Sequence, residues 1–498
     1  MKKFKLALIP LFIITLTGST SIEPPSKLNV LFIIADDLNC AIGAYGDALV
    51  KTPNLDKLAK EGVLFGNAHV QYPLCGPSRV SLMTGLYPDQ TKSKKLRLYV
   101  RQTIPDVVTL GQKFRTENYH SVRVGKIYHY HNPRDIGTAG HDDSYTWDRT
   151  VNPYGRDKKE EYKIKTLKPK LDGGTLSWLE ADGNDEEQTD GIGAMETINF
   201  LDEFAQSKEN FFLAFGLYRP HVPFVAPKKY FDLYDLADFQ VPESSDDYLK
   251  TIPKPAAISV RSKKEQVYLD KELSKTIKRA YYATTSFMDA QIGRVLDKLK
   301  ATGLDKNTII VFTSDHGYHL GEKEITGKNT LWDPTTRVPL MFAGPGISKG
   351  ARCGRPAELL DIYPTLADLC GLKSVPDEIE GLSLVPQLKD AKAPRSRPAI
   401  TSHGPGNDSA RTETHRYIRY ADGSEELYDI RKDPHEFKNL ASDPKTKKIR
   451  KKLASYLPKS PVKPVEGSNA RLIERKKDGS VYWQNSLIGR DAKIPEYE

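Results

Sequence analysis

The chain has 498 residues, of which 38% are hydrophobic and 28% are charged, and its formal net charge at pH 7 is +9. This composition excludes an intrinsically disordered chain, a coiled coil and a collagen-like fibre, and the length accommodates one large core with a smaller second domain. The excess of basic residues permits an acidic partner, a class that includes nucleic acid and anionic polysaccharides, without identifying one.

Residues 1–21 have the order of a secretory signal peptide. Lys2, Lys3 and Lys5 precede an apolar run over 6–16, and small residues follow over 17–21. The apolar run is short for a membrane span, and no later segment is long and apolar enough for one. We therefore expect an exported protein, periplasmic or extracellular, with no membrane association once the signal is removed. An uncleaved membrane tether is the alternative.

The segments that follow alternate between strand and helix patterns. The run 30–35 is continuously apolar, which is typical of a strand buried on both faces of a parallel sheet. The same reasoning predicts further strands at 63–70, 120–124, 211–215, 308–313 and 338–343, and helices at 54–61, 77–85, 106–117, 273–300 and 361–369. This alternation predicts an α/β fold with a mostly parallel sheet flanked by helices.

The pattern changes near residue 395. Short strand-like segments at 399–402, 417–420 and 426–429 are joined by turn residues, which is typical of a small antiparallel sheet. A basic helix is expected over 445–456, and either a polyanion-binding strip or an ordinary solvated face accounts for its lysines. We therefore predict a large domain at 22–395 and a C-terminal subdomain at 396–498.

Acidic residues follow two of the predicted strands. Asp36 and Asp37 come directly after the strand at 30–35, and Asp315 and His316 follow the strand at 308–313. The carboxyl ends of parallel strands meet at one edge of a sheet, so these side chains should converge there. Carboxylate oxygens suit Ca²⁺ or Mg²⁺. The nitrogen of His316 is a poor ligand for Ca²⁺, and orienting a neighbouring aspartate or a bound anion is its alternative role.

The four cysteines, Cys40, Cys75, Cys353 and Cys370, are too few for a disulfide-stapled scaffold. Cys353 and Cys370 flank one strand-to-helix segment, but sequence does not show whether they pair. Cys75 is distinctive because it opens the sequence Cys75-Gly-Pro-Ser-Arg79, at the start of a predicted helix. A helix N-terminus directs backbone N–H groups and the positive end of the helix dipole at an anion.

This five-residue sequence resembles the defining motif of the type I sulfatases. The resemblance covers nearly the whole chain after the signal and is closest to the iduronate-2-sulfatase group, through segments that include 30–37, 124–129, 212–224 and 313–322. It implies an alkaline-phosphatase-like fold with catalysis in 22–395, and hydrolysis of sulfate esters. It also implies that a dedicated maturation enzyme oxidises Cys75 to Cα-formylglycine, whose hydrate carries one hydroxyl to attack sulfur and another to expel the product.

The resemblance also assigns roles to individual residues. A Ca²⁺ ion, or alternatively Mg²⁺, would be held by Asp36, Asp37, the converted Cys75, Asp315 and His316. Positive groups are needed around an anionic sulfate, and the matching positions are Lys126, His129, His221 and Lys328. Among these, His221 is expected to protonate the leaving alcohol and Lys328 to bind sulfate. Arg79 and His129 are expected to hydrogen-bond the hydrate hydroxyls, with His129 as base. His131 and His319 lie near these motifs and are candidates for lining the pocket.

One segment departs from the iduronate-2-sulfatase pattern Gly-Glu-His-Gly-x-Trp-x-Lys. Here the residues read Gly321-Glu-Lys-Glu-Ile-Thr-Gly-Lys328, which keeps the lysine and loses the His and Trp expected beside the sugar. The expected substrate is a sulfated glycan, with ulvan or carrageenan as alternatives to an iduronate-containing one, and no nucleic acid partner is expected. A phosphatase or phosphodiesterase of the same superfamily and a non-catalytic glycan-binding relative are the competing hypotheses.

Overall fold

The structure is a computed structural model that describes residues 27–169, 173–242, 248–261 and 264–460, together with a few residues between 462 and 488. The predicted signal at 1–21 lies outside the described residues. No helix within the described part is long and apolar enough to cross a membrane.

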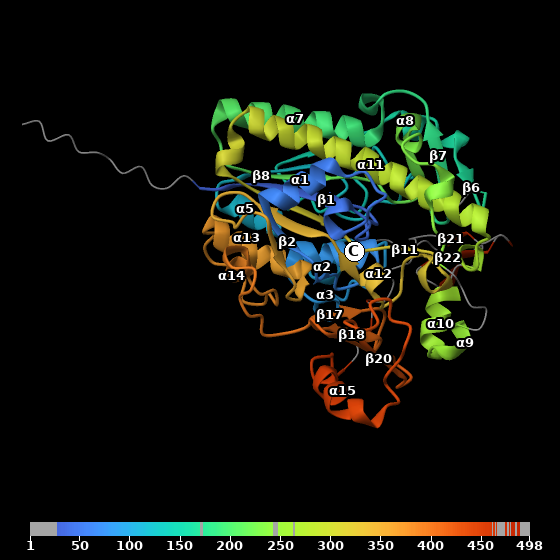
Figure 1. The fold of residues 1–498 in the computed structure, drawn as a ribbon. Helices are drawn as coiled ribbons and strands as arrows, with labels where there is room; N and C mark the ends of the chain where they lie inside the picture. Colours follow the sequence, from blue (N-terminus) through green and yellow to red (C-terminus); the bar gives the residue numbers. More distant parts are fainter. Residues whose placement is uncertain are drawn as a thin grey trace, which may run out of the picture.

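An eight-stranded sheet forms the centre of the molecule (Figure 1), with the strand order β15-β2-β14-β10-β1-β8-β4-β5. Every neighbouring pair is parallel except the two that involve β14, which runs antiparallel to β10 and to β2. The prediction of a mostly parallel α/β sheet is therefore confirmed. The strands are β1 (Asn29–Ala35), β2 (Gly62–Phe65), β4 (His120–Gly125), β5 (Arg149–Val151), β8 (Phe211–Gly216), β10 (Thr308–Ser314), β14 (Leu340–Ala343) and β15 (Ala351–Cys353).

Helices cover both faces of this sheet. Leu31 and Ile33 of β1 pack toward α1, α7 and α11, while Val30 and Phe32 pack toward α2, α5 and α13. Because successive side chains of a strand point to opposite faces, a strand covered on both sides is continuously apolar, as 30–35 is. The helices are α1 (Pro53–Glu61), α2 (Cys75–Thr84), α5 (Leu110–Thr116), α7 (Thr189–Ser207), α11 (Lys271–Ala301) and α13 (Ile362–Cys370).

Several element predictions differ from the structure, among them the strand expected at 338–343, which is divided into β13 and β14 in two different sheets. The strand expected at 63–70 is divided into β2 and β3 (Ala68–His69), and β3 belongs to a separate sheet with β13 (Arg337–Val338) and β16 (Ala357–Glu358). The helix expected at 106–117 begins only at Leu110, because the Thr109 side chain accepts a hydrogen bond from the Gln112 backbone N–H and caps the helix there. The helix expected from residue 77 begins two residues earlier, at Cys75.

A four-stranded antiparallel sheet follows near the C-terminus, formed by β17 (Ala399–Ser402), β18 (Asp408–Arg411), β19 (His415–Arg419) and β20 (Glu425–Asp429). Only β18 was not predicted. The basic helix is α15 (Lys447–Ala454), which buries Leu453 and leaves its lysines exposed. The division of the chain into a large domain at 22–395 and a C-terminal subdomain at 396–498 stays a prediction. Cys353 and Cys370 are both free thiols.

The antiparallel sheet is joined to the central region by a buried arginine. Arg416 of β19 is fully buried and forms ion pairs with Asp333 and Glu436. It also donates a hydrogen bond of 2.9 Å to the Leu331 carbonyl. Asp333 begins the short helix α12 (Asp333–Thr336), so this arginine links the C-terminal strands to the loop before that helix.

Candidate active site

The ends of β1 and β10 bring three acidic residues together. The two strands pair in parallel with Ala35 opposite Ser314, so the chain leaves both strands at the same edge of the sheet. Asp36, Asp37 and Asp315 are fully buried there. The backbone N–H of Asp37 donates a 3.0 Å hydrogen bond to Asp315 Oδ1, which fixes the two turns against each other. The predicted convergence of these strand ends is present in the structure.

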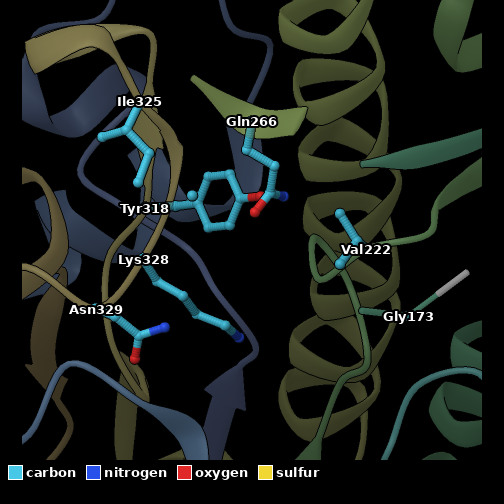
Figure 2. A pocket seen from close by; sticks show the side chains of 8 residues that line it. Gly173, Val222, Gln266, Tyr318, Ile325, Lys328 and Asn329 are labelled. Atoms are coloured by element: carbon cyan, nitrogen blue, oxygen red, sulfur yellow. The ribbon is translucent and has the colours of Figure 1, made fainter. Parts of the chain in front are cut away.

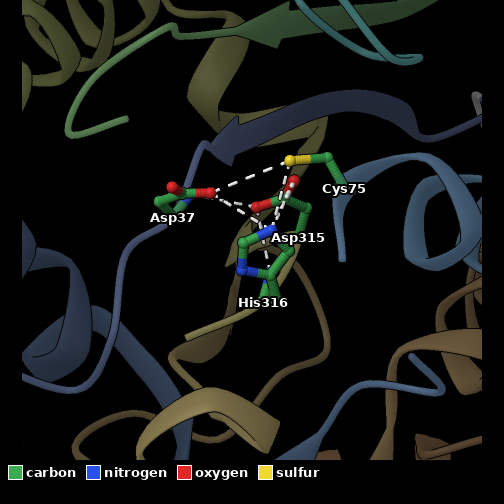
Figure 3. Close-up of side chains that lie close together, drawn as sticks. All are labelled: Asp37, Cys75, Asp315 and His316. Carbon is green, nitrogen blue, oxygen red and sulfur yellow. Dashed lines mark hydrogen bonds and ion pairs between the residues drawn. The ribbon is translucent and has the colours of Figure 1, made fainter. Parts of the chain in front are cut away.

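Cys75 lies at the first position of α2, against these strand ends. Its Sγ is 3.2 Å from His316 Nε2 and 3.8 Å from Asp37 Oδ1 (Figure 3). Lys328 Nζ also lies 3.2 Å from this sulfur. Burial raises the pKa of the Cys75 thiol well above its ordinary value, despite the adjacent Lys328 cation. An unconverted thiol here is protonated and is therefore a poor nucleophile. The surrounding polar groups suit an oxygen-bearing group at this position.

Arg79 lies one helical turn after Cys75 and is completely buried. Each of its N–H groups has a protein acceptor: Nε donates to Asp315 Oδ2 (2.9 Å), Nη1 to the carbonyls of Lys126 and Ile127 (2.9 Å each), and Nη2 to Asp36 Oδ1 (3.0 Å) and the Ala35 carbonyl (3.4 Å). A guanidinium has five N–H donors. No N–H donor of Arg79 is left for a hydrate hydroxyl in this arrangement. Arg79 instead bonds α2 to the ends of three strands.

Lys328 and His221 approach Asp37 from two different loops. Lys328 Nζ lies 2.8 Å and 3.0 Å from the two carboxylate oxygens of Asp37, and His221 Nε2 lies 3.7 Å from Oδ2. Burial would raise the pKa of Asp37, but the neighbouring cationic groups outweigh it and lower the pKa to about 2. The other ring nitrogen of His221 donates to the Val222 carbonyl, which leaves Nε2 directed toward the centre of the site.

Lys126 and His129 follow β4. Gly125 and Gly216 end the neighbouring strands β4 and β8, and a Cβ on Gly125 would lie 2.0 Å from the Gly216 carbonyl oxygen, so only glycine permits this approach. Lys126 Nζ lies 2.5 Å from Asp36 Oδ2. His129 is about 5% exposed, and neither of its ring nitrogens has a hydrogen-bond partner among the described residues.

Four of the predicted metal ligands form one group. The ligand atoms of Asp37, Cys75, Asp315 and His316 all lie within 4.8 Å of one another, and all four side chains are buried. His316 Nδ1 donates to the Gly317 carbonyl, so its Nε2 faces Asp37 Oδ1 at 3.1 Å. A cation between these atoms would relieve the repulsion between a nitrogen lone pair and a carboxylate, so the donor set fits a divalent metal. Asp36 lies outside this group and pairs with Arg79 and Lys126 instead.

Two protein-family models match this chain. The family model described as Sulfatase matches residues 28–372, and the model for the C-terminal part of N-sulphoglucosamine sulphohydrolase matches residues 321–463. The chain belongs to the sulfatase family. The sulfatase is a sulfuric ester hydrolase, as the resemblance carried by the Cys75 motif implied.

Two curated relatives support this assignment. The sulfatase is 37% identical over 453 residues to a protein named Sulfatase from Formosa agariphila, with 87% of each chain covered. It is 33% identical over 391 residues to the iduronate 2-sulfatase of Mus musculus, with 70% of each chain covered. Among solved structures, a phosphonate monoester hydrolase from Silicibacter pomeroyi superposes with a TM-score of 0.72. The superposition covers 92% of the sulfatase and 99% of the hydrolase chain. At 22% identity this last similarity shows the fold alone.

Lys328 is one of the residues that line a narrow cleft of the sulfatase (Figure 2). Tyr318, Ile325, Lys328 and Asn329 lie on one side of the view and Gly173 and Val222 on the other, with Gln266 between them; Gly327 completes the lining. Sequence reasoning missed Asn329 and Gln266. Asn329 directly follows the predicted Lys328, which was a usable signal, whereas nothing in the sequence around Gln266 marks it. His319 is fully buried against Thr330 and is absent from this lining.

The segment that departs from the iduronate-2-sulfatase pattern places Lys323 outside the cleft lining. Lys323 is only 3% exposed and turns away from the cleft lining, into a box of aromatic rings with centroids 4.6–5.6 Å from its Nζ, formed by Tyr248, Trp332, Tyr428 and Phe437. Its Nζ donates to the Tyr248 hydroxyl (2.6 Å) and the Glu436 carbonyl (2.5 Å). Lys323 therefore does not line the cleft, whereas Ile325 and Gly327 of the same segment do. That this segment neighbours the sugar stays a prediction.

Proposed function

We propose that this enzyme is an exported, iduronate-2-sulfatase-like hydrolase of sulfate esters on a sulfated polysaccharide or oligosaccharide, and that Cys75 acts after conversion to Cα-formylglycine. The observation that carries the proposal is the placement of Cys75 at the start of α2, with Lys328 Nζ and His316 Nε2 each 3.2 Å from its Sγ. The named relatives include an iduronate 2-sulfatase, which supports a sulfated glycan as substrate. Ulvan and carrageenan remain the alternatives.

The modified residue supplies an aldehyde hydrate, which offers a nucleophilic oxygen and a way to release the product by elimination. A thiol lacks both features. It attacks through sulfur, and the adduct that it forms carries no second hydroxyl from which the sulfate could be eliminated. The high pKa of the buried Cys75 thiol adds to this argument, since it removes the thiolate that an unmodified cysteine would need. Conversion requires an oxidising maturation enzyme as a partner.

A Ca²⁺ or Mg²⁺ ion would be held by the carboxylates of Asp37 and Asp315, and it would neutralise the charge that gathers on sulfate oxygens. The side chain of Lys328, fixed by Asp37, supplies a second positive charge at the inner end of the cleft. Positive groups that are already oriented stabilise developing negative charge without reorganisation.

Proton transfer is assigned to two histidines. His221 points Nε2 at the centre of the site and holds Nδ1 on the Val222 carbonyl, so its tautomer and direction are fixed. We propose that Nε2 takes up a proton from solvent when the anionic substrate binds, so that the ring becomes an imidazolium, and that this proton then passes to the leaving alcohol. His129 lies beyond Lys126 and has unpartnered ring nitrogens within the described structure, which suits the proposed role of base.

The proposal is tested on protein produced together with a formylglycine-generating enzyme. The tryptic peptide that ends at Arg79 contains Cys75, and conversion changes its mass by the loss of H₂S and the gain of one oxygen. We expect this mass change together with hydrolysis of an aryl sulfate. An unchanged peptide from a host that converts other sulfatases would overturn the mechanism. Recovery of the protein from the periplasm with a new N-terminus near residue 22 tests export.

A further inference from the structure

Three neutral polar side chains line the cleft around Lys328. They are Gln266, Tyr318 and Asn329, and we call them the polar wall (Figure 2). Gln266 and Tyr318 are each only 2% exposed, and Asn329 is half-buried. No described residue forms a hydrogen bond with the polar atoms of these three side chains. Leaving buried polar groups without a partner is costly in free energy, so the polar wall indicates a ligand in the cleft.

Gln266 is held next to the segment that carries Lys328. The adjoining residue Val267 forms an antiparallel bridge with Ile325, which itself lines the cleft. A Cβ on Gly327 would lie 3.6 Å from Gln266 Oε1, which is an ordinary van der Waals distance. The carboxamide of Gln266 therefore lies against the residue that directly precedes Lys328.

Asn329 reaches the cleft because its backbone is left-handed, with φ of 73°. Successive side chains of an extended segment point to opposite faces, so Lys328 and Asn329 would normally diverge. A left-handed residue breaks this alternation, and asparagine is one of the few residues that adopt the conformation readily. Figure 2 shows the side chains of Lys328 and Asn329 extending to the same side of the chain. The Asn329 carboxamide is thereby placed beside the charge that faces Cys75.

Aromatic packing fixes the ring of Tyr318. The ring stacks on Tyr281 with centroids 5.8 Å apart and an interplanar angle of 20°, and it meets Phe224 edge-on at 6.2 Å. Tyr281 in turn donates its hydroxyl to the Asp37 carbonyl, so the stack is tied to the end of β1. The Tyr318 hydroxyl is therefore held at the cleft without a hydrogen bond of its own to a described residue, and it is free to bind a ligand.

The polar wall suits hydroxyl groups better than a second anion. A carboxamide presents N–H donors and a carbonyl acceptor, and a sugar hydroxyl can likewise donate and accept. A carboxylate or sulfate only accepts, so it would face the carbonyl oxygens of Gln266 and Asn329 unfavourably. Among the described residues of the lining only Lys328 is charged, and both carboxylate oxygens of Asp37 already bind it. A second anion at the polar wall would find no further positive partner in this part of the lining.

We propose that the polar wall binds hydroxyl groups of the sugar ring that carries the scissile sulfate, so that the enzyme selects rings with free hydroxyls next to the sulfate ester. This inference rests on the proposed function and specifies its substrate class. Val222 and Ile325 offer apolar contact to the C–H groups of the same ring. A ring on which the neighbouring hydroxyls are absent or sulfated leaves the polar wall unpaired and is a poor substrate.

Binding is tested by calorimetric titration of unconverted protein, which retains the Cys75 thiol. The ligands are inorganic sulfate and every positional monosulfate of methyl galactoside, methyl glucoside and methyl iduronoside. For the monosulfate that binds most tightly, we expect Gln266→Leu to raise Kd about tenfold more than it raises Kd for inorganic sulfate, and Tyr318→Phe about fivefold more. Tyr318→Phe retains the ring that stacks on Tyr281, so it keeps the fold. The matched control is Gln206→Leu, at an exposed position of α7, which should change neither Kd.

Turnover by converted enzyme is tested on the same monosulfate and on analogues in which each hydroxyl next to the sulfate is replaced by hydrogen. Wild type should lose about tenfold in kcat/KM on at least one analogue, and Gln266→Leu or Asn329→Ala should lose much less on that analogue because the protein partner is already gone. If Kd depends on the polar wall but converted enzyme hydrolyses nothing, the proposed function fails and this inference stands. If no monosulfate binds more tightly than inorganic sulfate, or if Gln266→Leu and Tyr318→Phe leave every Kd unchanged, the inference fails.

Discussion

Lys328 Nζ lies 3.2 Å from Cys75 Sγ although the two residues are 253 positions apart in the chain. The contact holds because Asp37, at the end of β1, lies beside both side chains and binds the lysine through two oxygens. The position of the charge beside Cys75 is thus fixed by the end of β1, to which the lysine is bound.

Replacing Lys328 should lower the rate of catalysis strongly and leave the protein folded. We expect Lys328→Met to lower kcat/KM for an aryl sulfate by about 10²–10³-fold, since it removes a fixed positive group facing the reacting sulfate. The measurement is steady-state hydrolysis by protein whose Cys75 conversion has been verified. Lys349→Met, at an exposed position, serves as control. A loss of less than threefold would show that Lys328 does not face the sulfate.

Arg79 should contribute chiefly to stability. Arg79→Met would leave Asp36 and Asp315 buried beside each other with fewer cationic partners, and breaking a buried ion pair of this kind costs about 3–5 kcal/mol. Urea unfolding followed by circular dichroism measures the change. The control Arg431→Met removes an ion pair in which the arginine is exposed, and it should cost about 0–1 kcal/mol. Equal losses for the two variants would contradict the role assigned to Arg79.

A divalent cation should stabilise the folded enzyme through Asp37 and Asp315. We expect Ca²⁺ at about 100 times its Kd to add about 2.7 kcal/mol to the free energy of unfolding, and EDTA to remove that increment. Thermal unfolding with and without Ca²⁺ or Mg²⁺ measures it. Asp37→Asn and Asp315→Asn should abolish the cation effect, whereas Asp238→Asn, on the surface, should preserve it. A cation effect that survives both active-site substitutions would place the ion elsewhere.

Lys323 should make stability depend on pH in the alkaline range. Burial lowers its pKa from 10.5 to about 8, although the nearby Glu436 and Glu426 oppose the shift. Between about pH 8 and 10.5 the folded protein has released this proton while the unfolded chain retains it, so the contribution of Lys323 to stability rises with pH. Relative to Lys323→Met, the wild type should gain about 3 kcal/mol over that interval, measured by urea unfolding. A constant difference between the two proteins would show an unshifted lysine.

The residues of the candidate site could be located from the sequence because they follow buried strands or lie in a short motif. Asp37 and Asp315 lie where continuous apolar runs end, and the parallel pairing of β1 with β10 then brings them together. Asn118, two residues before β4, adopts a left-handed turn conformation with φ of 62°, which asparagine tolerates.

The contacts that sequence did not reveal depend on tertiary structure. The motif includes Arg79, but only the fold shows that its five donors are occupied by acceptors from separate strand ends. The aromatic box around Lys323 likewise draws on residues from four separate segments, and no local pattern marks them. Gln266 reaches the cleft from the short 3₁₀ turn Lys264–Gln266, which no periodicity specifies.

The buried Arg416 makes the C-terminal sheet inseparable from the catalytic region. If the chain were cut near residue 395, Asp333 and the Leu331 carbonyl would lose their shared partner in the loop that follows Lys328. A chimaera that joins this catalytic region to the C-terminal part of another sulfatase would therefore have to bring an arginine to the same position. In engineering, the residues of the cleft and the C-terminal sequence should therefore be exchanged together, because the loop beside the cleft takes part of its shape from strands that do not line it.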